Sequence, residues 1–166
     1  MNTEPIELPI ATHHGQFVAH YSDKGLAGLD FPRAGNRPRA VNSKSIPVEI
    51  LRWHRMTTDA LQKGLAGRKA RNFPPLDWTG TTVFQQAVWR AMLEIPAGET
   101  KSYGEIAKTI GKPRAVRAVG GACGANPIPV LVPCHRVLAA QKKIGGFGGG
   151  LHWKRTLLGI EGIEVK

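Results

Sequence analysis

Cys134, His135 and Arg136 are adjacent in the sequence, and their side chains are those of a nucleophile, a base and a cation. At neutral pH only about a few per cent of a free cysteine is thiolate. Adjacent cations stabilise a thiolate, and His135 and Arg136 would be the cations here. Neighbours in sequence need not touch in space, so two interpretations stay open. Cys134 is either a nucleophile activated by its neighbours or a buried structural thiol.

The segment that leads to Cys134 is apolar and rich in proline. It reads Asn-Pro-Ile-Pro-Val-Leu-Val-Pro over residues 126–133. Because proline fixes φ and lacks an N–H group, three prolines predict a stiff, extended approach. Such an approach would hold the thiol in place instead of leaving it on a mobile loop.

The two cysteines, Cys123 and Cys134, predict neither a disulfide nor a zinc site. Residues 1–10 lack the basic-then-apolar pattern of a secretory signal. We therefore expect a cytoplasmic protein with reduced thiols. No pair of cysteines or histidines has the close spacing that is typical of zinc ligands.

The net charge is +11, and its distribution indicates a polyanionic partner. Residues 106–160 contain no Asp or Glu. Because neutralising phosphates releases counterions, a basic stretch of this kind is typical of nucleic-acid-binding proteins. A general solubility charge is the alternative, and an anionic membrane fits less well because the cations do not line one face of an amphipathic helix. The nine cations of the stretch are Lys108, Lys112, Arg114, Arg117, Arg136, Lys142, Lys143, Lys154 and Arg155.

The first half of the chain has strand patterns followed by a helix pattern. A polar, exposed loop and a basic, proline-containing linker flank the predicted helix. We predict strands at Ile6–Ile10, Gln16–Ser22 and Gly25–Phe31, a turn at 23–25, a loop at Arg33–Lys44, a helix at Val48–Leu65 and a linker at Gly67–Asp77. The predicted domains are therefore residues 1–78 and 79–166.

The second half begins with two helix-start signals. Thr82–Gln85 and Ser102–Glu105 both have the S/T-x-x-E/Q form of a capping box. The first predicts a helix that ends before Pro96, and the second predicts a short helix that stops at Gly111.

A third helix is predicted from Pro113, in its first turn, to about Cys123. With the preceding short helix it would form a helix-turn-helix. Val116, Val119 and Cys123 are spaced to share its apolar face.

The other face of this third helix is basic and slim. Arg114 and Arg117 lie on it, and Ala118, Gly120 and Gly121 are small. Each glycine weakens a helix by about 1 kcal/mol relative to alanine, so some gain should offset the two. Entry into the narrow minor groove of DNA is one such gain, and close packing on a neighbouring helix is the alternative.

The sequence Val-Pro-Cys-His-Arg-Val around Cys134 resembles the active-site signature of the O6-alkylguanine-DNA alkyltransferases. Further segments match that family in order, and coverage is nearly continuous from Thr79 to Gly162. They are Phe84-Gln85, Val88-Trp89, residues 95–100, residues 102–107, residues 117–120, Asn126-Pro127, Leu157-Leu158 and Glu161-Gly162. The first half matches more loosely, through residues 25–29 and Gly80.

This resemblance implies an α+β fold, with a small ribonuclease-H-like α/β N-terminal domain before a helical, winged-helix-type DNA-binding domain. It implies direct DNA repair by one irreversible transfer of an alkyl group from O6 of guanine, with O4 of thymine as a second candidate, to Cys134. No metal or organic cofactor is implied. The expected partner is double-stranded DNA bound through the minor groove by a monomer, with no membrane partner, and with the protein associated with the nucleoid when bound.

The resemblance also implies roles for residues around the thiol. His135 would accept the thiol proton through a bound water, and Glu161 would orient that water and His135. Asn126 would tie the third helix to the segment carrying Cys134 through backbone hydrogen bonds. Tyr103 would donate a hydrogen bond to the departing guanine.

Because the target atom lies inside the duplex, the nucleotide must rotate out of the stack. Arg117, followed by Ala118 on the third helix, resembles the arginine that fills the space left behind. Gly104 and Lys112 would contact phosphates. Backbone groups at Cys134 and Val137 would read the edge of the base.

The glycine-rich segment 145–150 resembles the pocket wall of the family but departs from its commoner form. Phe147 and Gly148 stand where tyrosine and serine are usual. Phe147 can still stack on the base, whereas Gly148 offers only its backbone N–H to O6, so the preferred alkyl group stays open. Gly149 continues the wall, and Lys154 matches a lysine that follows it.

Three other functions remain alternatives. Non-catalytic lesion binders on this scaffold carry tryptophan where this chain has Cys134, and regulatory relatives add a cysteine-rich sensor domain. A cysteine hydrolase would give no reason for the basic stretch.

Overall fold

The N-terminal half is built on a three-stranded antiparallel sheet in the order β1-β2-β3. The computed structural model describes residues 4–35, 37–39 and 43–165. The strands are β1 (Ile6–Thr12), β2 (Gly15–Tyr21) and β3 (Leu26–Asp30). They confirm the three predicted strands, and the N–H of Ser22 donates to the Gly25 carbonyl (2.9 Å) to close the predicted turn. In the described part of the predicted loop at 33–44, most residues are exposed; residues 36 and 40–42 lie outside the described residues.

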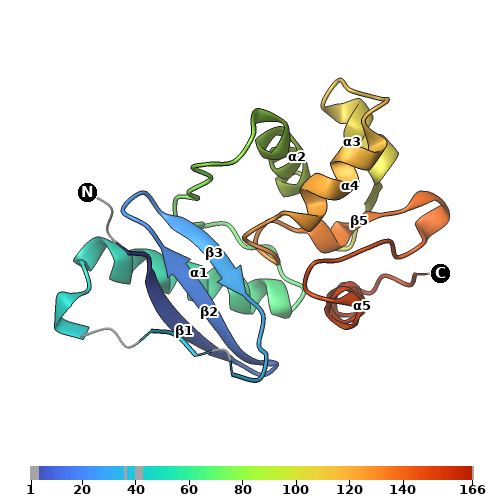
Figure 1. Ribbon diagram of the computed structural model, residues 1–166. Helices are drawn as coiled ribbons and strands as arrows, with labels where there is room; N and C mark the ends of the chain where they lie inside the picture. The colour runs from blue at the N-terminus through green and yellow to red at the C-terminus, as the bar shows by residue number, and fades with distance from the viewer. Residues whose placement is uncertain (1–3, 36, 40–42, 166) are drawn as a thin grey trace.

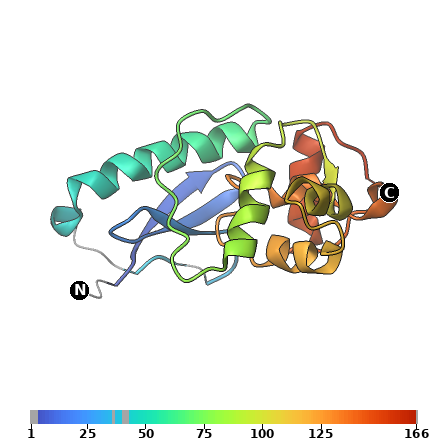
Figure 2. The same cartoon turned by 90° about the horizontal axis from the view of Figure 1, so that it is seen from above.

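Helix α1 (Val48–Leu65) packs along the sheet and has the predicted bounds; a short 3₁₀ turn, η1 (Ser43–Ser45), precedes it. Polar contacts as well as apolar packing join α1 to the sheet. The hydroxyl of Tyr21 lies 2.8 Å from Nδ1 of His54, and Nε2 of His54 lies 3.1 Å from the Pro9 carbonyl. Figure 2 shows α1 running the length of this half, with its C-terminal end against the other half of the molecule.

The predicted linker at 67–77 is tied at its end to the sheet. The N–H of Leu26 donates to the Pro75 carbonyl and the N–H of Asp77 donates to the Leu26 carbonyl, both at 2.8 Å. Gly25 has φ +153, and a side chain there would collide with the Pro75 carbonyl. Only glycine suits this crossing. The division of the chain near residue 78 stays a prediction.

The C-terminal half is mostly helical (Figure 1). Both capping boxes are present, with Thr82 and Gln85 at the start of α2 and Ser102 and Glu105 at the start of α3. The predicted α+β class is therefore confirmed. The elements are α2 (Val83–Leu93), β4 (Lys101–Ser102), α3 (Tyr103–Thr109), α4 (Val116–Gly124), η2 (Cys134–Arg136), β5 (Val137–Leu138), η3 (Ala140–Lys142) and α5 (Leu151–Ile160), with β4 and β5 forming a parallel pair.

Three details of the sequence analysis are wrong. Helix α4 begins at Val116, so Pro113 lies in the turn before it and not in its first turn. Val119 and Cys123 are buried as expected, but Val116 is 40% exposed and does not belong to the apolar face. The segment 127–133 is a series of turns instead of an extended strand, because side-chain and backbone hydrogen bonds fold it back on itself.

One hydrophobic cluster includes buried residues of both halves. A backbone hydrogen bond joins β3 to the segment before Cys134, since the N–H of Leu29 donates to the Pro127 carbonyl (2.9 Å). Within the C-terminal half, the indole N–H of Trp89 donates to the Ala122 carbonyl (2.8 Å) and so fastens α2 to α4. None of the helices in the described residues has both the length and the apolar character needed to cross a membrane.

The Tyr21–His54 contact generates a prediction on stability. Burial lowers the pKa of His54, against a weaker opposing effect of the Pro9 carbonyl. A histidine whose pKa is lower in the folded than in the unfolded state contributes stability above its ordinary pKa, about 6.5, and loses that contribution as the pH falls towards the folded value. We expect the midpoint of thermal unfolding to decrease as the pH falls from 7.5 to 5, and to decrease less in His54→Gln.

The control is His13→Gln, at an exposed position in the β1–β2 turn, which should behave like the wild type. A decrease in His54→Gln equal to that of the wild type would contradict the prediction.

Candidate functional site

The segment before Cys134 is held by Asn126, which follows α4 directly. The side-chain amide of Asn126 donates to the Val132 carbonyl (2.8 Å), and its oxygen accepts from the N–H of Ile128 (3.0 Å). The N–H of Val132 also donates to the Ile128 carbonyl (3.0 Å). One side chain thus pins both ends of the turn and links it to the end of α4. These are the kind of bonds expected of Asn126; its functional role stays a prediction.

Cys134 begins the 3₁₀ turn η2 and is only 5% exposed. Its N–H donates to the Val132 carbonyl (2.8 Å). Burial raises the pKa of its thiol to about 11, although the Asn126 amide and the charge of Lys154 act in the opposite direction. The thiol is therefore protonated at neutral pH in the free protein, and a reaction through sulfur requires a group that takes its proton.

His135, the residue after Cys134, forms a buried pair with Glu161. Nε2 of His135 lies 3.0 Å from Oε1 of Glu161, and each side chain is 2% exposed. Burial lowers the pKa of His135, with Glu161 opposing it. The histidine is therefore a neutral base whose Nε2–H donates to the carboxylate. Its other ring nitrogen, Nδ1, is buried and bonds to none of the described residues, so its lone pair is available.

Arg136 binds the same carboxylate. Its Nη2 lies 2.7 Å from Oε1 of Glu161, its Nε lies within 3.1 Å of both oxygens, and its Nη1 donates to the Ile95 carbonyl (2.7 Å). Burial raises the pKa of Glu161, but the hydrogen bonds and charges of His135 and Arg136 outweigh burial and lower it to about 2. The carboxylate is thus ionised over the whole working range of pH.

These contacts correct the expectation that both neighbours of Cys134 stabilise its thiolate by positive charge. The guanidinium of Arg136 is committed to Glu161, and His135 is neutral at rest. The cation that lowers the pKa of Cys134 is Lys154, which is fully buried on α5. Its Nζ donates to the carbonyls of Val137 (2.8 Å) and Gly146 (3.1 Å).

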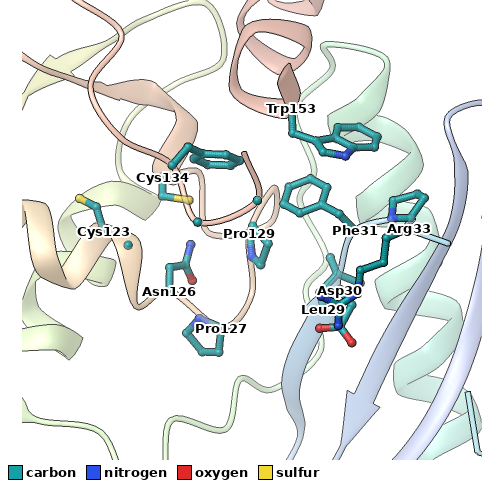
Figure 3. A pocket seen from close by; sticks show the side chains of 15 residues that line it. Leu29, Asp30, Phe31, Arg33, Cys123, Asn126, Pro127, Pro129, Cys134 and Trp153 are labelled. Carbon is teal, nitrogen blue, oxygen red and sulfur yellow. The ribbon is translucent and has the colours of Figure 1, made fainter. Parts of the chain in front are cut away.

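Cys134 lies at the wall of a cavity of about 340 Å³. Figure 3 shows Cys134 and Asn126 on one side and Phe31 and Trp153 on the other. Of the predicted residues, Phe147, Gly148 and Gly149 also line it. The volume falls in the range of sites for small molecules, roughly 300–1,000 Å³.

The sequence analysis missed the contribution of the N-terminal sheet to this cavity. Residues 29–33, at the end of β3, form much of one wall. The ring of Phe31 stacks at a tilt on Trp153 (4.7 Å between centroids) and meets Phe147 edge-on (5.8 Å). A side chain at Gly149 would collide with the ring of Phe31, which explains a glycine there. No motif marks Phe31 in the sequence, because its role depends on how the two halves pack.

Two predicted base-binding residues, Tyr103 and Val137, are not among the residues that line the cavity. The hydroxyl of Tyr103 lies close to Gly145, because a Cβ atom added at Gly145 would stand 2.7 Å from that hydroxyl. Nζ of Lys154 lies 6.0 Å from the centre of the Tyr103 ring. Val137 is fully buried, its N–H donates to the Cys134 carbonyl, and its carbonyl accepts from Lys154. The base-reading roles of both residues stay predictions.

The expected DNA contacts lie on the helix-turn-helix formed by α3 and α4. Arg117 and Ala118 are exposed near the start of α4, and Lys112 is exposed in the turn before it. Gly104 is partly exposed in the first turn of α3. Across the described residues, no group of three or more His, Cys, Asp or Glu could hold a metal ion.

Fold and site together define an α+β protein that has a helix-turn-helix and, in the segment that follows it, a buried thiol next in sequence to a buried histidine–glutamate pair. Comparison with known proteins places it further. Residues 83–163 match the family model described as 6-O-methylguanine DNA methyltransferase, DNA binding domain. A methylated-DNA–protein-cysteine methyltransferase of Methanosarcina barkeri is 39% identical over 156 residues, which are 94% of each chain.

The chain belongs to the methylated-DNA–protein-cysteine methyltransferase family. A relative from Mycobacterium bovis is 54% identical over 103 residues, which span 62% of this chain and 62% of that protein. Among solved structures, Mycobacterium tuberculosis OGT in complex with DNA has a TM-score of 0.72 and 40% identity, covering 92% of this chain and 90% of that one.

The buried lysine generates the second prediction. Lys154→Met removes the cation that lowers the pKa of Cys134 and leaves the carbonyls of Val137 and Gly146 without their donor. We expect modification of Cys134 by iodoacetamide, mapped by mass spectrometry, to slow by about threefold at fixed pH as its pKa rises. The free energy of unfolding should fall by about 1–3 kcal/mol.

The pH profile separates an electrostatic effect from a loosened structure. Loss of the charge moves the profile of Cys134 modification to higher pH, whereas loosening exposes the thiol, relieves the effect of burial on its pKa and moves the profile to lower pH. Lys108→Met, at an exposed lysine of α3, should change neither quantity. An unmoved profile in Lys154→Met would refute the assigned role.

Proposed function

We propose that this protein repairs alkylated DNA by moving one alkyl group from O6 of guanine, and as a second candidate O4 of thymine, onto Cys134. The observation that carries this proposal is a thiol in the cavity wall that is followed directly in the chain by a histidine in a buried pair with Glu161. The names of the relatives support it, since they are methylated-DNA–protein-cysteine methyltransferases.

The buried groups supply what transfer to sulfur needs. The thiol proton passes to Nδ1 of His135, through an intervening water, and Glu161 stabilises the imidazolium that forms. The thiolate attacks the saturated carbon, a C–S bond forms, and the C–O6 bond breaks with its electron pair going to the guanine. A proton delivered to the base neutralises that charge, and Tyr103 is the proposed donor of the hydrogen bond that assists.

The balance of the reaction predicts that each molecule acts once. The sulfur exchanges its hydrogen for the alkyl group, and the guanine takes up one proton in place of the alkyl group, which balances the proton that the thiol released. A thioether is stable, and the site holds no described group placed to cleave it. We therefore propose that the protein is a stoichiometric reagent.

The position of α4 suggests how a damaged guanine would reach the cavity. Asn126 at the end of this helix forms part of the cavity wall, and Arg117 lies exposed near its start. We infer that α4 lies against the minor groove of double-stranded DNA, that the damaged nucleotide rotates out, and that Arg117 takes its place in the stack. The M. tuberculosis relative in complex with DNA supports this partner.

The proposal extends to location and assembly. A monomer suffices, because one chain provides the cavity wall, the proposed proton acceptor His135 and the basic helix α4. We propose the cytoplasm, with association to the nucleoid, because DNA and reduced thiols are both found there. Recognition of a lesion without transfer is the less favoured alternative, because a cysteine stands at the reacting position.

Intact-mass analysis tests the transfer itself. After incubation with an oligonucleotide duplex carrying one O6-methylguanine, the protein should gain one methyl group, mapped to Cys134. Cys134→Ala should gain none, and Cys123→Ala, which removes the other thiol near the cavity, should still be methylated. More than one lesion repaired per protein molecule, or lesion loss without protein methylation, would refute the proposal.

The proposed role of Arg117 gives a separate prediction. Arg117→Ala should slow repair in duplex DNA by about tenfold or more, because an unfilled gap in the stack costs a few kcal/mol. Reaction with the free base O6-methylguanine should change little, because the free base needs no rotation out of a stack.

Arg114→Ala, at a neighbouring exposed cation, is the matched control for loss of charge. It should weaken binding to any duplex and leave the rate at saturating DNA unchanged. Equal losses with duplex and free base in Arg117→Ala would instead indicate damage to the pocket.

A further inference from the structure

Val130, in the turn before Cys134, has a backbone conformation that its residue type disfavours. Its φ is +72, in the left-handed region, and its side chain is only 5% exposed. A β-branched residue in this region is a genuine outlier, and such a conformation persists only where surrounding contacts over-determine it. Glycine would adopt the same backbone without cost, so the valine side chain must serve a contact.

That contact is with Gly64 in the last turn of α1. A Cβ atom at Gly64 would stand 3.0 Å from Cγ1 of Val130, and no other atom outside α1 would come near it. The valine therefore sits directly against the bare backbone of the helix. A glycine inside a helix lowers its stability relative to alanine, and this close approach is the reason for one here.

The end of α1 is itself fixed. The N–H of Ala66 donates to the Gln62 carbonyl (3.1 Å) and that of Arg68 to the Lys63 carbonyl (2.9 Å). On the far side, an added Cβ at Gly67 would stand 3.0 Å from the carbonyl of Ile160, the residue before Glu161. The helix end thus lies between the segment that carries the thiol and the segment that carries the carboxylate.

Hydrogen bonds couple the position of Val130 to that of Cys134. Val130 lies inside the turn closed by the Val132 N–H and the Ile128 carbonyl (3.0 Å), which Asn126 holds from both ends. The N–H of Cys134 then donates to the Val132 carbonyl (2.8 Å). A shift of Val130 therefore changes where the thiol stands in the cavity.

We propose that Gly64 and Val130 are positioning residues for alkyl transfer, through which the N-terminal helix α1 sets the place of Cys134. This inference rests on the proposed function and assigns part of it to the half of the chain that lacks the reacting groups. A cavity of about 200 Å³ borders the contact, and its lining includes Ala60, Gly64, Val130, Leu131 and Pro133. This space allows the valine to move under an added methyl at residue 64.

The test compares Gly64→Ala, Val130→Gly and the double variant. Each is assayed in single-turnover transfer from an O6-methylguanine duplex over a range of excess protein concentrations. Gly64→Ala displaces Val130 by a few tenths of an ångström. We expect the rate constant at saturation to fall by about five- to tenfold, because small errors in the placement of reacting atoms are costly. The half-saturating protein concentration should not change, because the DNA-binding surface is untouched.

The double variant separates positioning from general damage. Val130→Gly releases the turn from α1 and should also slow transfer at saturation. With no valine to displace, the added methyl at residue 64 should then have no further effect, so the double variant should match Val130→Gly alone. The two effects are therefore expected to be non-additive.

Stability and active fraction provide the control readouts. Alanine favours a helix, so Gly64→Ala should keep the midpoint of thermal unfolding and the fraction of molecules that become methylated. Gly159→Ala is the matched control and should keep the wild-type rate. Gly159 lies in α5, and apart from its own helix no atom of the described residues comes within 4 Å of an added Cβ.

Two outcomes would overturn the inference while leaving the proposed function intact. One is a wild-type rate at saturation in Gly64→Ala. The other is a slower rate whose effect simply multiplies with that of Val130→Gly. Failure of the wild-type protein to become methylated would instead refute the proposed function.

Discussion

The site depends on one buried carboxylate. Glu161 is 2% exposed, and a carboxylate removed from water is stable only if its oxygens are paired. Nε2 of His135 and two nitrogens of Arg136 satisfy it, while the Gly98 N–H lies 3.4 Å away. These bonds fasten the end of the chain to the 3₁₀ turn that begins with Cys134. Removing Arg136 would leave the buried charge with only the neutral histidine as its side-chain partner. The geometry at the thiol and the stability of this half are therefore coupled.

A second buried charge shapes the other side of the thiol. Lys154 is fully buried, and its ammonium group is satisfied by the carbonyls of Val137 and Gly146. These two residues flank the stretch from β5 to the glycine-rich wall, so the lysine closes that loop while its charge opposes the rise in the pKa of Cys134. Burial raises the pKa of the thiol, and the charge of the lysine offsets part of that rise. In the proposed reaction, the histidine–glutamate pair takes the thiol proton when the damaged guanine occupies the cavity.

The sequence predicted those parts of the fold and site that rest on local rules. Capping boxes fixed the starts of α2 and α3, and the three strand patterns and α1 were found because their periodicity and turns are local. The errors arose where distant groups compete. The proline-rich run folds into turns because Asn126 binds its backbone, and Arg136 turns from the thiol because Glu161, distant in sequence, offers a stronger partner. Phe31 escaped notice because only packing of the sheet on the glycine-rich wall gives it a role.

The N-terminal half is therefore more than a support for the DNA-binding half. It touches the site at three separate points: the Leu29 N–H bonds the Pro127 carbonyl, Phe31 lies against Gly149, and Gly64 faces Val130. The first and third contacts hold the two sides of the turn that precedes the thiol, and the second holds the opposite wall of the cavity. A cavity enclosed in this way has its width set by packing between the halves, whereas its reacting groups all belong to one of them. A helical half on its own would retain the thiol, the histidine and the carboxylate but would lose the surface that fixes the distance between sulfur and base.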